Sequence, residues 1–223
     1  AALGADPEDP RLVRGAEVLL ELAQPSSGGF AAARGRPPSA CFTAELCATF
    51  ARLGYAHHPR VREAVAWLAA RQEGRGGWTC PDLRHLTGGA CPVAAVATLR
   101  LVADHPARER VKVAPLAARS AAWLVERSLL MPAAPRGWLR FSHPNLGQAD
   151  LLEALFCLAR LRWPGGEWAL PALRAIRGRQ DGNGRLAQEQ RVALGEGAGS
   201  ASRWTTLKAL VVLGAYGSLL EGE

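Results

Sequence analysis

Four residues in the first half of the sequence carry the side chains that bind zinc most often in proteins: Cys41, Cys80, His85 and Cys91. The sequence contains five cysteines in all, an odd number at irregular spacing. This pattern argues against a full disulfide framework and favours free thiols or a metal site in a reducing compartment. The four residues do not have the spacing of a zinc finger, so only the fold could bring them together.

The composition narrows the class of protein that could hold such a site. The chain has 223 residues, of which 48% are hydrophobic and 21% charged, so it is neither disordered nor too small for a sizeable core. No apolar run approaches the ~18 residues of a transmembrane helix. The net charge is +7, and all basic residues except Lys112 and Lys208 are arginines scattered along the chain. Scattered arginines favour a solvated surface over a nucleic-acid interface, which usually needs clustering.

Four segments share one pattern, in which an apolar helix leads to a polar residue, a glycine turn and an aromatic or apolar residue. The polar residues are Gln24, Gln72, Ser128 and Gln180, and the residues that follow the turns are Phe30, Trp78, Trp138 and Leu186. Second helices are predicted at about 40–53, 91–103, 147–161 and 202–216, from their helical apolar spacing. Prolines at 59, 106, 115, 164 and 171 are predicted to bound the helices. Strand alternation is absent.

These patterns predict an all-α fold of four stacked helical hairpins in a single domain over residues 1–223. The repeats run over about 9–56, 57–106, 111–163 and 167–217. A glutamine side chain in such a turn can satisfy backbone groups at a helix end while an aromatic ring packs over it. Phe30, Trp78 and Trp138 are therefore predicted mainly to hold neighbouring repeats together.

The repeat resembles that of the terpenoid cyclase and protein prenyltransferase superfamily, also known from squalene cyclase repeats. The segment Trp67–Trp78, with Gln72 before Gly76, Gly77 and Trp78, carries the resemblance most clearly, and Arg179–Gly182 carries it in part. Cys41–Thr43, Trp138–Phe141 and Ser202–Leu210 are similar to segments of bacterial members. The resemblance implies an α/α toroid with inner and outer helix layers, of which four hairpins would form only a partial ring.

In the resembled fold the second helices form an inner ring, and their N-termini open onto a cavity. Cys41 and Cys91 begin two adjacent inner helices, and the loop between them can deliver Cys80 and His85 to the same rim. Three thiols and an imidazole would then form a tetrahedral zinc site. Two alternatives stay open, namely small buried cysteines or a Cys80–Cys91 disulfide. Cys47 and Cys157 are predicted to be core residues.

The resemblance also implies substrate contacts near the inner-helix N-termini, from Glu45, Arg140, Gln148, Asp150 and Arg203. The two arginines would suit a diphosphate or carboxylate, although each residue alone is more often at a surface or a helix end. The sequence lacks the Asp-x-Asp-Asp acid of class II cyclases and the Asp-rich magnesium motif of class I synthases. The zinc-ligand motif of protein prenyltransferases does not map onto it either, so no catalytic residue is assigned.

Three hypotheses follow for function. The first is a zinc-containing enzyme, a transferase or cyclase-like protein acting on an isoprenoid or other apolar substrate. The second is a non-catalytic binding or assembly module with a structural zinc, in which a homodimer completes the ring. The third is a basic helical solenoid that binds nucleic acid, motivated by a pI of about 9.8.

The first ten residues do not resemble a signal peptide, and we expect a cytoplasmic protein. Because the chain begins at Ala1 and not at a methionine, the sequence leaves open whether preceding residues were removed.

Overall fold

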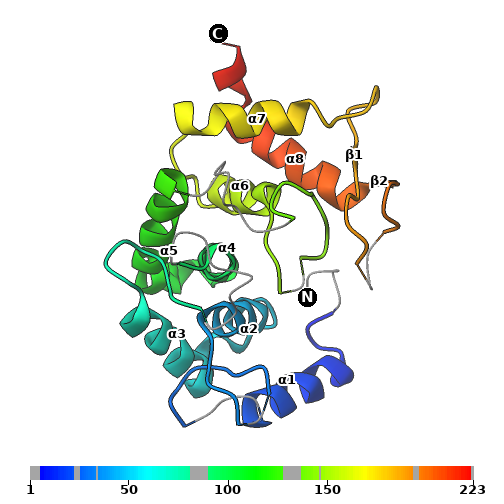
Figure 1. Ribbon diagram of the computed structural model, residues 1–223. Coiled ribbons are helices and arrows are strands. Elements are labelled where there is room, and N and C mark those ends of the chain that lie inside the picture. Colours follow the sequence, from blue (N-terminus) through cyan, green and yellow to red (C-terminus); the bar gives the residue numbers. More distant parts are fainter. Residues whose placement is uncertain are drawn as a thin grey trace. The chain divides into compact units, whose positions relative to one another are not determined.

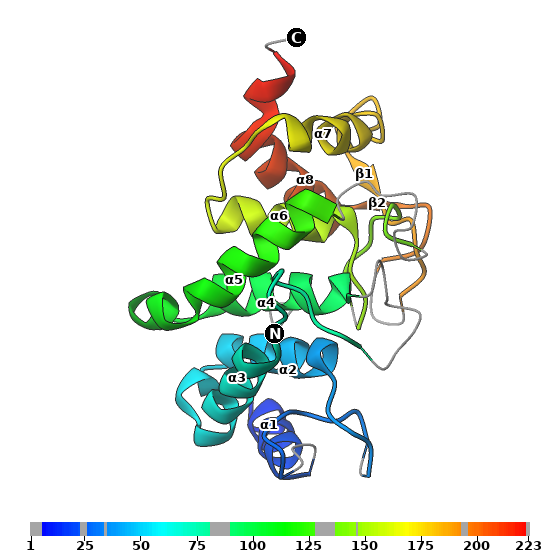
Figure 2. The same ribbon diagram turned by 60° about the vertical axis from the view of Figure 1, so that its left-hand side comes forward.

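Helices make up almost all of the regular structure in the computed structural model (Figures 1 and 2). The structure describes residues 6–22, 26–33, 35–80, 90–127, 137–145, 147–192 and 196–221. The α-helices are α1 (Pro10–Leu22), α2 (Ala40–Arg52), α3 (Pro59–Arg71), α4 (Pro92–Asp104), α5 (Ala107–Arg127), α6 (Leu151–Arg160), α7 (Leu170–Arg177) and α8 (Arg203–Tyr216). Short 3-10 helices are η1 (Tyr55–His57), η3 (Glu167–Ala169) and η4 (Gly217–Leu220). The predicted all-α class is confirmed, apart from a two-stranded antiparallel sheet of β1 (Leu186–Ala187) and β2 (Ala201–Ser202).

The chain divides into two compact units, Ala1–Trp123 and Leu124–Glu223. The first contains α1 to α4 and most of α5, and the second contains α6 to α8 with the short sheet. Each unit has its own buried core.

In the first unit, α2 and α4 pack side by side along their lengths (Figures 1 and 2). Eleven of the 13 residues of α4 are buried, and most of them are alanine, valine or leucine. A helix that is apolar all round is a central helix of its unit. Cys47, Phe50 and Leu99 are among the buried side chains of the pair, so the predicted core role of Cys47 is confirmed.

In the second unit, α6 packs against α8, and α7 also contacts α8. Leu151, Leu155, Cys157 and Leu158 of α6 are fully buried, as the apolar spacing predicts. Cys157 is therefore a core residue too.

The predicted second helices agree with α2, α4, α6 and α8 to within a few residues. The largest difference is at α6, predicted from 147 but beginning at Leu151, because the Asp150 carboxylate accepts a hydrogen bond from Glu153 N and caps the helix there. The prediction that Pro115 bounds a helix is wrong, since it lies inside α5. A proline inside a helix removes one hydrogen bond, and the burial of Val113 and Leu116 on either side outweighs that loss.

The glycine turn has the same hydrogen bonds in two of the four repeats. Gln72 Nε2 donates to Gly76 O at 3.0 Å, and Gln180 Nε2 donates to Gly184 O at 2.9 Å. Gly76 and Gly184 have φ of +92° and +75°, in the left-handed region that favours glycine. Gln24 and Ser128, the other two predicted polar positions, lie outside the described residues.

After the turn, the chain in every repeat returns to the start of the next helix. The carbonyl oxygens of Phe30, Trp78 and Trp138 accept hydrogen bonds from the backbone N–H groups of Ser39, Cys91 and Leu151, respectively. In the last repeat, Leu186 pairs with Ser202 across the short sheet. This return fixes where each of α2, α4, α6 and α8 begins relative to the turn before it.

Candidate metal centre

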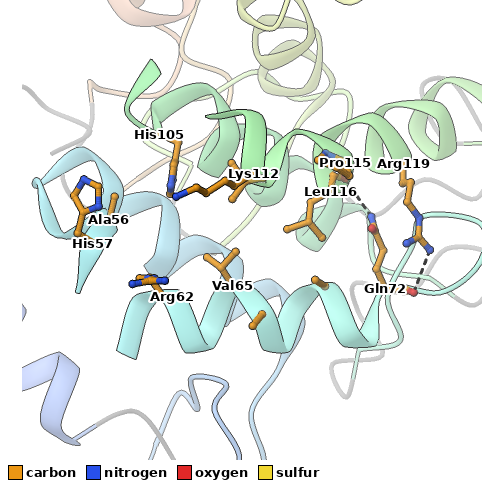
Figure 3. A pocket seen from close by; sticks show the side chains of 13 residues that line it. Ala56, His57, Arg62, Val65, Gln72, His105, Lys112, Pro115, Leu116 and Arg119 are labelled. Carbon is orange, nitrogen blue, oxygen red and sulfur yellow. Dashed lines mark hydrogen bonds between the residues drawn. The ribbon is translucent and has the colours of Figure 1, made fainter. Parts of the chain in front are cut away.

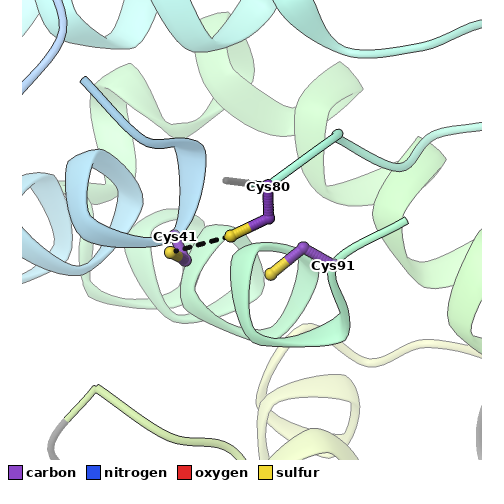
Figure 4. Close-up of side chains that lie close together, drawn as sticks. All are labelled: Cys41, Cys80 and Cys91. Carbon is purple, nitrogen blue, oxygen red and sulfur yellow. Dashed lines mark hydrogen bonds between the residues drawn. The ribbon is translucent and has the colours of Figure 1, made fainter. Parts of the chain in front are cut away.

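Three cysteines from separate parts of the first unit come together at the N-terminal ends of α2 and α4 (Figure 4). Cys41 is the second residue of α2, and Cys91 is the residue that caps α4. Cys80 follows the glycine turn by only a few residues and lies in the segment that returns toward α4. The cluster therefore joins two neighbouring helices and the segment between them.

Trp78 places Cys80 beside Cys91. Its indole Nε1 donates to Leu68 O of α3 at 3.0 Å, and its carbonyl accepts from Cys91 N at 2.9 Å. The ring is 1% exposed, so burial and two hydrogen bonds fix this residue. Cys80, two residues further along, is thereby held next to the start of α4.

The sulfur atoms are close enough to share one ion. All three Sγ atoms lie within 4.8 Å of one another, and Cys41 Sγ is 3.6 Å from Cys80 Sγ. Cys91 Sγ accepts a hydrogen bond from Ala94 N at 3.4 Å, as a capping side chain does. All five cysteines of the chain are described and all are free thiols, so the alternative of a Cys80–Cys91 disulfide is not formed.

The cluster is almost completely shielded from solvent. Cys91 is 0% exposed, Cys80 6% and Cys41 9%. Hydrogen bonding with the Cys41 and Cys80 thiols, followed by burial, raises the pKa of the Cys91 thiol. Without a cation Cys91 is therefore a neutral thiol, whereas a bound divalent cation would favour its thiolate.

Cys41 and Cys91 were both predicted to begin a helix, but their positions at the two helix ends differ. Ser39 precedes α2 as its capping residue, so Cys41 lies two positions deeper into its helix than Cys91 does. The thiols still meet, because Cys80 lies within reach of both helix ends. His85, the predicted fourth ligand, lies outside the described residues.

The predicted substrate-binding residues have other contacts. Glu45 accepts hydrogen bonds from Arg100 Nη1 on both carboxylate oxygens, at 2.6 and 2.7 Å, and so links α2 to α4. Asp150 is 1% exposed and accepts from the backbone N–H of Ser142 as well as capping α6. Both carboxylates therefore take part in holding the fold.

The other three predicted substrate-binding residues, Arg140, Gln148 and Arg203, are exposed and belong to the second unit. Arg203 lies 3.7 Å from the Glu196 carboxylate, and Gln148 lines a small cavity with Ser142 and other residues of that unit. Within the first unit, the structure gathers the three cysteines.

Sequence reasoning missed a buried ion pair in the second unit. Lys208 Nζ of α8 lies against the Glu153 carboxylate of α6, and each side chain is 7% exposed. The sequence gives one signal for it, a lysine inside the otherwise apolar stretch 207–213. Its position between two packed helices points to a role in holding α6 and α8 together.

Comparison with models of protein families found no match to this chain, and comparison with curated proteins found none either. Within the described part of the chain, no helix is both long and apolar enough to cross a membrane. The three-cysteine cluster is thus the feature that bears most directly on function.

Proposed function

We propose that this chain is a zinc-binding helical repeat protein in which Cys41, Cys80 and Cys91 bind one zinc ion. The observation that carries the proposal is the convergence of three thiols, from two helices and the segment between them, to within 4.8 Å. Cys47, in the same helix as Cys41, does not join the cluster, so the convergence is not a consequence of cysteine abundance.

The donor set fits zinc. Thiolates are soft ligands that select zinc over magnesium or calcium, which prefer oxygen. Thiolates at ~2.3 Å from a tetrahedral zinc lie ~3.8 Å from each other, close to the 3.6 Å between Cys41 Sγ and Cys80 Sγ. The positive ends of two helices would also favour negative charge on Cys41 and Cys91. His85 is the proposed fourth ligand.

We further propose that the chain is similar in fold to the terpenoid cyclase and protein prenyltransferase superfamily, as a partial α/α toroid. Gln72 and Gln180 each donate to the carbonyl of the glycine four residues later. This supports the proposal, because a fold made of repeats is expected to have the same turn more than once. The packing of α2 against α4 and of α6 against α8 supports it as well, because these would be the inner helices.

The burial of the cluster favours a structural role for the zinc. With four protein ligands the coordination shell is closed, and the metal would cross-link the starts of α2 and α4. An enzyme acting on an isoprenoid or other apolar substrate is the alternative that the resemblance supports. It requires an open coordination position, at which a bound metal acts as a Lewis acid.

Metal content of matched variants tests the proposal. Mass spectrometry of the purified chain should find about one zinc per wild-type chain. Cys41→Ala should lose it, whereas Cys47→Ala, the same change at another buried position of α2, should retain it. A wild-type chain that takes up no zinc on reconstitution, or a Cys41→Ala variant with full zinc content and stability, would overturn the ligand assignment.

A further inference from the structure

A cavity of about 410 Å³ lies between α3 and α5 in the first unit (Figure 3). No cysteine lines it, so it is separate from the metal centre and does not depend on the proposed zinc. Its volume falls in the range of small-molecule sites, which are ~300–1,000 Å³.

The lining has an apolar middle and a basic end. Val65, Ala66 and Ala69 of α3 face Val113 and Leu116 of α5 along its length. Figure 3 shows His57, Arg62, His105 and Lys112 gathered at one end, and Gln72 with Arg119 at the other. Among the described side chains that line the cavity, none is an aspartate or a glutamate.

The charge at the basic end is available to a ligand. Arg62 and Lys112 are both exposed, and neither forms an ion pair within the described part of the chain. Arg119 differs, because its Nη2 donates to Gln72 O at 3.3 Å and to Glu73 O at 2.8 Å and so caps the end of α3. An anion would therefore bind at the Arg62 and Lys112 end.

The direction of α3 and α5 also favours an anion at the Arg62 and Lys112 end. Gln72, which ends α3, hydrogen-bonds to Leu116 O and Ser120 Oγ of α5, while Arg62 and Lys112 line the opposite end of the cavity. The two helices are therefore parallel, and both present their N-terminal, positive ends toward the basic end. From Arg62 to Ala69 the helix rises by ~10 Å, the length of apolar surface available to a chain.

We propose that this cavity binds an amphipathic carboxylate, a medium-length alkyl chain with one carboxylate group. The carboxylate contacts Arg62 and Lys112, where the guanidinium offers a bidentate hydrogen bond. The alkyl chain lies along Val65, Ala69 and Leu116, toward Gln72.

Calorimetric titration of the full chain with octanoate tests the site and its chemistry. Octanoate should bind with one-to-one stoichiometry and about tenfold more tightly than octan-1-ol or octylammonium, which have the same chain without the negative charge. Butyrate, which lacks four methylene groups, should bind about 100-fold more weakly. Equal affinity for octanoate and octan-1-ol would overturn the proposed basic end.

Two pairs of variants locate the site. Ala69→Leu fills the apolar middle and should abolish binding, whereas Ala70→Leu, at an exposed neighbour outside the cavity, should leave it unchanged. Arg62→Gln should weaken octanoate binding about fivefold, and Arg177→Gln, the same charge change on exposed α7, should have no effect. All four positions are exposed, and circular dichroism would verify folding. Unchanged octanoate affinity in both Ala69→Leu and Arg62→Gln would exclude this cavity as the site.

Discussion

The side chain of Gln72 should contribute measurably to the stability of the first unit. Its Nε2 donates to Gly76 O at 3.0 Å and to Leu116 O and Ser120 Oγ at 3.2 Å each, and the residue is 7% exposed. It therefore fixes the glycine turn and ties α3 to α5. The amide has only two N–H hydrogens, so one of them is shared between two of these acceptors. Gln72→Ala therefore removes about two buried hydrogen bonds at ~1 kcal/mol each, and the free energy of unfolding should fall by about 2 kcal/mol, as measured by urea denaturation.

Two other variants separate this explanation from a simple loss of volume. Gln180→Ala removes the equivalent side chain, whose Nε2 donates a hydrogen bond to Gly184 O in a partly buried turn, and it should cost about 1 kcal/mol. Gln72→Glu keeps the volume but turns a carboxylate oxygen toward three oxygen acceptors, so it should destabilise at least as much as Gln72→Ala. The reasoning fails if Gln72→Ala costs no more than Gln180→Ala, or if Gln72→Glu is harmless.

Three further predictions concern packing and charge. Gly76→Ala should lower the free energy of unfolding by more than ~2 kcal/mol, because a Cβ would lie 2.1 Å from a backbone oxygen of α5 at a φ of +92°. Lys208→Met should cost about 3–5 kcal/mol, because the buried Glu153 carboxylate loses its cationic partner. Burial raises the pKa of Asp150 to about 6, so its stabilising contribution is present below about pH 4 and is lost as the pH rises through 6. Relative to wild type, Asp150→Asn should therefore gain about 3 kcal/mol of stability between about pH 4 and pH 7 in urea titrations.

Each of these predictions has an internal control. Gly74→Ala meets nothing within 4 Å, so a loss as large as that of Gly76→Ala would contradict the steric argument. Combining Lys208→Met with Glu153→Gln should recover part of the stability, because position 153 no longer buries a carboxylate without its cationic partner. A difference between Asp150→Asn and wild type that does not change with pH would show that Asp150 does not titrate in this range.

The helices that carry the cysteines could be predicted from sequence because their apolar spacing is regular. The convergence of Cys41, Cys80 and Cys91 followed from the repeat, in which equivalent helix ends lie next to each other. The exact position of each cysteine within its helix did not follow. It depends on which residue caps the helix, and this is Ser39 for α2 and Cys91 for α4. In both helices the capping residue is the one whose backbone N–H donates to the carbonyl of the residue after the glycine turn, namely Ser39 to Phe30 and Cys91 to Trp78.

Features that depend on packing between distant segments were beyond sequence reasoning. Glu45 was predicted to contact a substrate, and only the packing of α2 against α4 brings Arg100 to it. The cavity between α3 and α5 requires α5 to continue through Pro115, which sequence rules treat as a boundary. Both cases involve a local rule that tertiary contacts override.

X-ray absorption spectroscopy at the zinc edge, on the full chain as purified, tests the central claim most directly. The claim predicts about one zinc per chain with three sulfur ligands at ~2.3 Å and one nitrogen ligand at ~2.0 Å. A zinc shell made of oxygen and nitrogen alone, or a chain that remains without zinc after refolding in its presence, would contradict it.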